Sequence, residues 1–440
     1  MASRRWSPAG RTAAAFVAAA ALSGRPASGA GPDFDRAGAE PLVASLRDAA
    51  SGVGETNSAE EAVWVSVARS DVHHPRWSGL GLGVPAAQSA RASVYRLDPS
   101  RLPELSQYMH DRFGRCGGFF AYGSREEAEE DLRAPRSTAG GPYTLDREAF
   151  VRPILEKVRE TELRSTIESL AAYHNRYYQS ETGVAAASWI QARWQQLAAA
   201  LPGASANLVP HGNWKQPSVV LTVPGSDKPD EVVVLGGHLD SIAGWMSRSG
   251  SRAPGADDNA SGIAVLTEAI RVLADSGFRP SRTVQFMGYA AEEVGLRGSN
   301  EIARQYAREG RRVAGVIQFD MTNFKGSAEN VYLLSDNVDP ELTAFLAKLV
   351  ETYLGFKAPT TACGYGCSDH ASWTKSGFPA SAAFESAFNG MNRNIHTDRD
   401  TLANSGGSAQ HSVSFAKLAV AFASEIGKAA VAKPRAVSGR

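Results

Sequence analysis

The feature that most constrains the fold is an alternation of apolar, β-branched segments with amphipathic ones, beginning at about residue 145. Apolar residues recur at intervals of three and four in the amphipathic segments, which predicts helices. An alternation of strands and helices is typical of an α/β fold, in which a mainly parallel, mixed sheet is sandwiched between helices. Strands are predicted around residues 232–235, 283–289, 313–319, 331–335 and 379–386, and helices around 161–178, 261–277, 300–310, 340–355 and 413–430.

The first residues, 1–30, have the pattern of a secretory signal peptide. Arginines precede an apolar stretch from Thr12 to Leu22, and small residues follow it. The apolar stretch is too short to span a bilayer, and no other uninterrupted apolar run is long enough. We therefore expect a secreted protein without a membrane anchor.

Residues 31–142 differ from the regular part of the chain. They contain Gly-, Pro- and Ser-rich joints and few strong periodic patterns. The segment APRSTAGGPYT at residues 134–144 is typical of an exposed linker and processing site. The sequence thus predicts a smaller N-terminal segment followed by one large domain at residues 143–430.

The charge balance argues against nucleic acid as a partner. The chain has 46 basic and 46 acidic residues, a formal net charge of zero, and no long basic run. We expect a monomer that acts on a small molecule or a peptide.

Polar side chains follow three of the predicted strands at the point where each strand ends. His238 and Asp240 come after the first of these strands, Glu292 and Glu293 after the second, and Asp320 after the third. Sites in open α/β sheets lie outside the carboxyl ends of the strands. The three strands are therefore expected to deliver these groups to one edge of the sheet.

Two loop segments add candidates to this set. PGADDNASG precedes a predicted helix, so an N-cap role is enough to explain one of Asp257 and Asp258. The other is then available as a site residue. His396 lies in NIHTDRDT, after the last predicted core strand. Clustered carboxylates repel one another unless a cation balances them, and nitrogen and oxygen ligands suit zinc. The number of carboxylates favours two ions bridged by one of them, and hence hydrolysis through metal-bound water.

Two of the three cysteines, Cys363 and Cys367, are separated by a short glycine-containing loop. In an oxidising compartment such a pair can form a disulfide. The same spacing could ligate zinc, but there is no second cysteine pair to complete a site of that kind.

Seven motifs together closely resemble those of the secreted bacterial leucyl aminopeptidases, which are co-catalytic di-zinc exopeptidases. The resemblance covers about residues 145 to 425 and implies a zinc-exopeptidase (phosphorylase/hydrolase-like) fold with two Zn²⁺ per chain. It also implies a removable pro-segment that assists folding or inhibits, for which residues 31–142 fit by position and size, and a catalytic domain at 143–430. The motifs are GGHLDS, PGADDNASG, YAAEEVGLRGS, QFDMTN, CGYGCSDHASW, AFESAFN and NIHTDRDTLANS.

The resemblance assigns a role to each metal-site candidate. It implies that His238 and Asp320 bind one zinc, that Glu293 and His396 bind the other, and that Asp258 bridges the two.

Three further residues would complete the catalytic centre by the same resemblance. Asp240 would orient the imidazole of His238, and Glu292 would be the general base. Tyr365 would donate a hydrogen bond to the developing oxyanion.

The resemblance also implies a specificity pocket for a large hydrophobic N-terminal side chain such as leucine, on a peptide or protein substrate. Residues at the matching positions are Met321, Phe384, Phe388 and Ile395.

Two other functions are compatible with parts of the pattern. One is a related zinc exopeptidase of other specificity, such as a carboxypeptidase or a glutaminyl cyclase. The other is a non-catalytic binding ectodomain, which would be expected to have lost ligand residues. No ligand position and no base position is replaced in this chain, which favours an aminopeptidase.

Overall fold

The computed structural model describes residues 62–71, 80–115, 117–133, 140–244 and 249–430. The expected signal peptide lies outside the described residues, as do residues 31–61 of the expected pro-segment and residues 134–139 of the expected linker. No helix within the described ranges has the length and apolarity needed to cross a bilayer.

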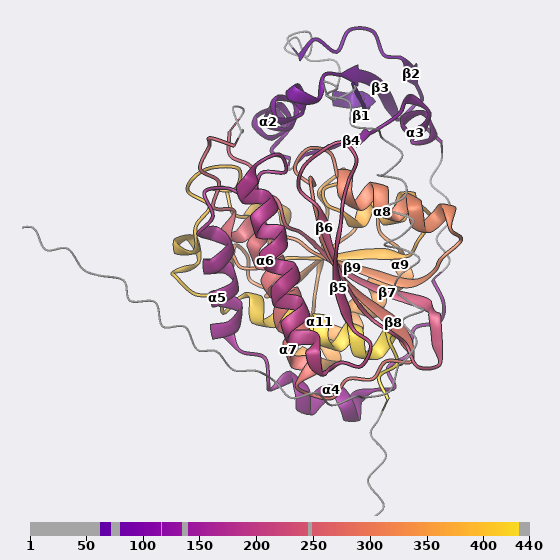
Figure 1. Cartoon of the computed structure of the whole chain (residues 1–440), viewed down its shortest axis with the longest axis vertical. Helices are drawn as coiled ribbons and strands as arrows, with labels where there is room; N and C mark the ends of the chain where they lie inside the picture. The colour runs from indigo at the N-terminus through magenta and orange to yellow at the C-terminus, as the bar shows by residue number, and fades with distance from the viewer. Residues whose placement is uncertain (1–61, 72–79, 116, 134–139, 245–248, 431–440) are drawn as a thin grey trace, which may run out of the picture. The chain divides into compact units, whose positions relative to one another are not determined.

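An eight-stranded mixed sheet organises the large domain, and its strand order is β11-β10-β12-β9-β7-β8-β6-β5. Strands β5 to β9 of this sheet are labelled in Figure 1. The central strand β7 runs parallel to both β8 and β9, and β12 runs parallel to β9, whereas β6 is antiparallel to β8. The expected α/β fold with a mixed sheet is confirmed. The strands are β5 (Ser205–Val209), β6 (Ser218–Val223), β7 (Lys228–His238), β8 (Arg282–Tyr289), β9 (Arg312–Phe319), β10 (Tyr332–Leu334), β11 (Thr360–Thr361) and β12 (Ala380–Phe384).

Helices pack against both faces of this sheet. Val233 and Leu235 of β7 belong to a core cluster with α5, α6, α7 and α11, whereas Val232 and Val234 belong to a cluster with α8. This alternation follows from the two-residue period of a strand, and it explains why both faces of β7 are apolar. The helices are α4 (Glu148–Leu155), α5 (Glu160–Ala171), α6 (Glu181–Leu197), α7 (Gly262–Ala274), α8 (Arg297–Arg308), α9 (Pro340–Leu349), α10 (His370–Lys375) and α11 (Ser412–Ile426).

The glycines that end β7 allow its neighbours to approach closely. A Cβ atom at Gly236 would lie 2.5 Å from the ring of Tyr289 on β8 and 2.6 Å from Oε1 of Gln318 on β9. Only glycine fits such a position. The close approach holds the three strands together at the edge where His238 ends β7.

Residues 62–133, which we call the N-terminal unit, form a second, antiparallel sheet with the strand order β2-β3-β1-β4. The sequence did not predict this sheet, because the regular alternation of strands and helices begins only at about residue 145. The elements are β1 (Val63–Ala68), β2 (Ala87–Gln88), β3 (Ala92–Leu97), α2 (Leu102–Phe113), β4 (Phe119–Tyr122) and α3 (Arg125–Glu130).

The N-terminal unit packs on the large domain through apolar contacts and ion pairs. Val65 and Leu105 share a core cluster with Tyr178 and Trp214 of the large domain. Arg304 on α8 pairs with acidic side chains of α3.

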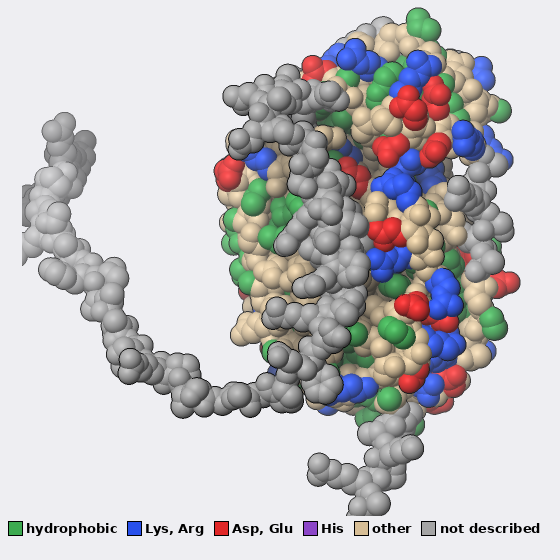
Figure 2. Space-filling model, turned by 45° about the vertical axis from the view of Figure 1, so that its right-hand side comes forward, with side chains coloured by type: hydrophobic (Ala, Val, Ile, Leu, Met, Phe, Trp, Pro, Cys, Tyr) green, Lys and Arg blue, Asp and Glu red, His purple; other side chains and the backbone are tan. Residues whose placement is uncertain are grey.

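Basic and acidic side chains are interspersed over the face shown in Figure 2.

Candidate metal centre

The ends of β7, β8 and β9 bring together the residues predicted to ligate metal. His238 is the last residue of β7, Glu293 lies in the loop after β8, and Asp320 directly follows β9. Asp258 lies in the turn before α7, and His396 lies in the loop after β12. These side chains form two groups, His238–Asp258–Asp320 and Asp258–Glu293–His396, whose ligand atoms lie within 4.8 Å of one another in each group.

Asp258 belongs to both groups. Its Oδ1 lies 3.0 Å from Nε2 of His238, and its Oδ2 lies 3.3 Å from Nε2 of His396. Asp320 Oδ1 is 3.4 Å from the first imidazole, and Glu293 Oε2 is 2.7 Å from the second. The arrangement is therefore two three-residue groups that share one carboxylate.

The donor set fits divalent cations. Asp320 Oδ1, Glu292 Oε1 and Glu293 Oε1 are buried and have no hydrogen-bond partner among the described residues. Burying carboxylate oxygens without partners is costly unless positive charge compensates them. Imidazole nitrogen and carboxylate oxygen are the ligands that zinc takes in hydrolytic sites.

The pKa values of the ligand candidates are shifted by burial and by the opposite charges around them. Burial raises the pKa of Glu293 to about 7. Burial also disfavours protonated His238, but the carboxylates of Asp320 and Glu292 outweigh it and raise the pKa of His238 well above its usual value. For Asp258, hydrogen bonds from His238 and His396 outweigh burial and lower its pKa. The raised pKa of Glu293 reflects the cost of burying its negative charge, which a bound cation would offset.

Asp240 has a wider positioning role than the sequence indicated. Its Oδ1 accepts a hydrogen bond from the backbone N–H of Glu292 at 3.0 Å, and its Oδ2 accepts one from the N–H of Glu293 at 3.2 Å. Its Oδ1 also lies 3.5 Å from Nδ1 of His238. Asp240 therefore links the ends of β7 and β8 as well as lying beside an imidazole.

Glu292 lies beside both groups and belongs to neither. Its Oε2 is 4.0 Å from Nε2 of His238, and burial raises its pKa well above the usual value for a glutamate. A carboxyl group with a raised pKa that is not committed to a metal is suited to proton transfer.

Asp257 does not cap the following helix, so the N-cap interpretation of this residue is wrong. Its carboxylate is buried and accepts hydrogen bonds from the backbone N–H of Asn323 and from Nδ2 of Asn392. The N–H of Gly262, at the start of α7, instead donates to the side chain of Asn259.

Sequence reasoning missed two residues that support the ligands, although both lie inside the quoted motifs. Asp400 accepts hydrogen bonds from the backbone N–H groups of Asp257 and Asp258. The Ser368 hydroxyl donates to Oδ2 of Asp320 at 2.6 Å. Aspartate and serine are common in loops, so only their contacts reveal these roles.

Backbone conformation is also unusual at this edge. Ala291, Met321 and His396 have φ values of 56°, in the left-handed region that residues other than glycine rarely adopt. Ala291 precedes Glu292, and Met321 follows Asp320. Such conformations cluster at functional sites, where the surrounding structure holds them in place.

A buried arginine binds the backbone just before the shared aspartate. Arg176 donates through Nε to the carbonyl oxygen of Leu239 and through its terminal nitrogens to those of Pro254 and Gly255, at 2.6 to 2.9 Å. Burial lowers the pKa of Arg176 to about 10, so it keeps its charge at neutral pH. It therefore joins the end of β7 to the turn that carries Asp258.

Replacing Arg176 by glutamine should lower the free energy of unfolding by about 3–5 kcal/mol, because the carbonyls it satisfies would remain buried. Urea denaturation of the two proteins measures the difference. The exposed Arg152 gives a matched control, and Arg152→Gln should change stability by no more than about 0.5 kcal/mol. Equal losses for the two variants would contradict the assignment.

A small apolar cavity lies beside Asp320. Met321, Phe384 and Phe388 line it as predicted, whereas Ile395 is buried in the same apolar cluster but does not line it. The sequence did not single out Leu334 and Met391, which also line it, because they are ordinary core residue types.

Tyr365 lines the same cavity and lies within the loop closed by Cys363 and Cys367. The two cysteines form a disulfide with a Cα–Cα distance of 6.5 Å. The expected tyrosine thus lies next to Asp320, at the junction of the cavity and the metal-ligand groups.

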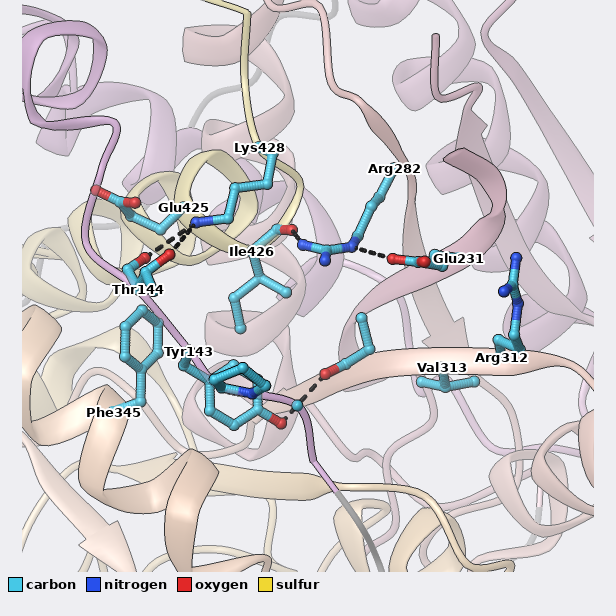
Figure 3. Close-up of a pocket in the computed structure, with 13 residues that line it drawn as sticks. Tyr143, Thr144, Glu231, Arg282, Arg312, Val313, Phe345, Glu425, Ile426 and Lys428 are labelled. Carbon is cyan, nitrogen blue, oxygen red and sulfur yellow. Dashed lines mark hydrogen bonds and ion pairs between the residues drawn. The ribbon is translucent and has the colours of Figure 1, made fainter. Parts of the chain in front are cut away.

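A larger cavity, of about 300 Å³, lies at the other ends of the strands (Figure 3). Glu231 lines it from β7, and Arg282 and Arg312 line it from the starts of β8 and β9. The charges of Arg282 and Lys428 have partners, since Arg282 pairs with Glu231 and Lys428 pairs with Asp146. None of the predicted site residues lines this cavity.

Comparison with known proteins agrees with this arrangement. The model of peptidase family M28 matches residues 218–421. A probable leucine aminopeptidase of Trichophyton verrucosum is 37% identical over 356 residues, which are 79% of this chain and 96% of that protein. Leucine aminopeptidase 1 of Arthroderma otae is 36% identical over 80% of this chain and 96% of its own length.

Solved structures are similar over the same part of the chain. The crystal structure of LapB from Legionella pneumophila has a TM-score of 0.71 and 31% identity, and the match covers 83% of this chain and 100% of that one. The LapA aminopeptidase of the same organism has a TM-score of 0.71 and 27% identity, over 83% and 98% of the two chains. The fold, the metal-ligand groups and these relatives define a metal-dependent aminopeptidase.

The chain belongs to peptidase family M28.

Proposed function

We propose that this protein is a secreted di-zinc aminopeptidase that preferentially removes large hydrophobic residues, such as leucine, from the N-termini of peptides. The observation that carries the proposal is the carboxylate of Asp258 shared by two metal-ligand groups beside an apolar cavity. Two ions bridged by a carboxylate are an arrangement known in aminopeptidases. We further propose that the protein acts as a monomer.

Two zinc ions bound at these groups would polarise the scissile carbonyl and lower the pKa of water. His238 and Asp320 would hold one ion, Glu293 and His396 the other, and Asp258 both. Asp240 keeps Glu292 and Glu293 in place through their backbone N–H groups.

Glu292 would carry out the proton transfers. As general base it takes a proton from the attacking water, and as general acid it then passes that proton to the leaving amine. Burial raises the pKa of Glu292 well above the usual value for a glutamate, which makes it a stronger base than an exposed carboxylate. The Tyr365 hydroxyl would donate a hydrogen bond to the oxygen on which negative charge develops.

The apolar cavity supports the preference for a large hydrophobic first residue. It adjoins Asp320 and is lined mainly by Met, Leu and Phe side chains. A leucine side chain gains about 1.5–3 kcal/mol from complete burial in such surroundings.

Export and processing are supported by the sequence pattern at residues 1–30 and 134–144. We propose that residues 31–142 are a pro-segment and that the protein is made as a zymogen. Cleavage in the linker would separate the N-terminal unit from the catalytic domain at 143–430.

The substrate assignment predicts strong discrimination against a blocked amino terminus. After proteolysis in the linker, the protein should cleave leucine-p-nitroanilide, while N-acetyl-leucine-p-nitroanilide should react roughly 10⁴-fold more slowly, because acetylation removes the amino group that the site must bind. Release of p-nitroaniline measures both rates, and elemental analysis should give two zinc ions per chain. Equal rates on the two substrates would contradict the assignment.

A further inference from the structure

One imidazole from the N-terminal unit lies directly beside the metal centre. His110 is in the last turn of α2, and the centroid of its ring is 4.9 Å from that of His396, with the two rings tilted by 36°. Its Nδ1 is buried and has no hydrogen-bond partner within the described part of the chain. An unsatisfied buried nitrogen is a cost to folding, so the stability of the unit does not explain this residue.

The end of the same helix also contacts the proposed oxyanion donor. Gly114 ends α2 in the left-handed conformation, with φ of 64°. The guanidinium of Arg115, which follows it, lies 5.0 Å from the centre of the Tyr365 ring and pairs with Asp71. One turn of chain, residues 110–115, therefore contacts both His396 and Tyr365.

The N-terminal unit is anchored close to the loop that carries the proposed base. The backbone N–H of Ala121 on β4 donates to the carbonyl oxygen of Gly295 at 3.0 Å. A Cβ atom at Gly295 would lie 2.8 Å from the side chain of Ala121, so only glycine permits this approach.

Contacts beyond that loop hold the unit in place as well. Phe120 and Tyr122 share an apolar cluster with Leu296 and Ala371. Lys375 pairs with Asp131 of the unit, and its ammonium lies 3.4 Å from the centre of the Phe120 ring. With anchors on several elements, the last turn of α2 is held in place over the site.

We propose that His110 keeps the uncleaved chain inactive by filling the space beside His396 that the amino end of a peptide must enter. The inference rests on the proposed function, since it supposes that substrate binds with its amino terminus at the metal centre. Arg115 would reinforce the block by covering the ring of Tyr365. Removal of the N-terminal unit would then open both positions at once.

The test uses the intact, zinc-loaded chain and two substitutions at one position. His110→Ala empties the space, whereas His110→Phe keeps a ring there. Binding of L-leucine hydroxamate, a leucine analogue that chelates metal, is measured by isothermal titration calorimetry. We expect His110→Ala to bind it about tenfold or more tightly than the wild type, because a larger fraction of the chain is competent to bind.

The companion measurements separate a block from a loss of structure. His110→Phe and the exposed-residue control Arg112→Ala should bind the hydroxamate as weakly as the wild type. The kcat/KM for leucine-p-nitroanilide should rise in His110→Ala by a similar factor to the affinity. Thermal melting of each intact variant checks that the N-terminal unit stays folded on the domain.

Two results would overturn the proposal: equal hydroxamate affinity in wild type and His110→Ala, or full activity of the uncleaved wild-type chain. A different result would show that the proposed aminopeptidase function itself is wrong. In that case wild-type protein cleaved in the linker by trypsin would not release p-nitroaniline, whatever the hydroxamate affinities of the intact variants.

Discussion

Glu292→Gln should lower kcat for leucine-p-nitroanilide by about 10²–10⁴-fold and leave the zinc content unchanged, because the substitution removes proton transfer but no metal ligand. Glutamine keeps the size and most of the polarity of the side chain, so the two metal-ligand groups should keep their geometry. Steady-state kinetics and elemental analysis of the same preparation measure both quantities.

A matched control is available on α8. Glu309→Gln makes the same chemical change at an exposed position and should leave both kcat and zinc content as in the wild type. If Glu292→Gln retained wild-type turnover, Glu292 would not be the base.

Asp258→Ala should abolish measurable activity and lower the affinity for both zinc ions. Its two oxygens contact one imidazole of each group, so no other single substitution removes a partner from both. We expect a loss of zinc affinity greater than the roughly 10- to 100-fold that follows loss of a residue supporting a ligand. Equilibrium dialysis against a zinc buffer, followed by elemental analysis, gives the affinities.

Asp400→Asn provides the comparison for this variant. Asp400 holds the backbone of Asp258 but is in neither metal-ligand group, so the substitution should weaken zinc binding without abolishing it. Full zinc content in Asp258→Ala would show that the two groups do not depend on a shared carboxylate.

The sequence predicted the central part of the fold well, because the strands that build it have strong signals. The segments that became β7, β8 and β9 are apolar on both faces, as strands covered by two layers of helices must be. Polar residues directly after these strands also predicted where the two metal-ligand groups lie. The antiparallel strands β5 and β6 and the sheet of the N-terminal unit were not predicted, because they lie outside the alternation of strand and helix on which the prediction was based.

The supporting contacts of the site could not be predicted in the same way. Arg176 is an arginine in a loop between two helices, and nothing in its neighbourhood in the sequence indicates that it binds backbone carbonyls near residue 254. His110 lies in a helix with no recognisable motif, far in sequence from His396. Such contacts depend on tertiary packing, which local pattern does not encode.

The apolar contacts that hold the N-terminal unit also shape what remains without it. Tyr177, Tyr178 and Trp214 of the large domain are buried in one cluster with Val65 and Leu105 of the unit. Departure of the unit would leave these aromatic rings facing water, and an exposed apolar patch of that kind attracts other apolar surfaces. Removal of the N-terminal unit, as proposed above, would therefore leave the catalytic domain with more exposed apolar surface around these three rings.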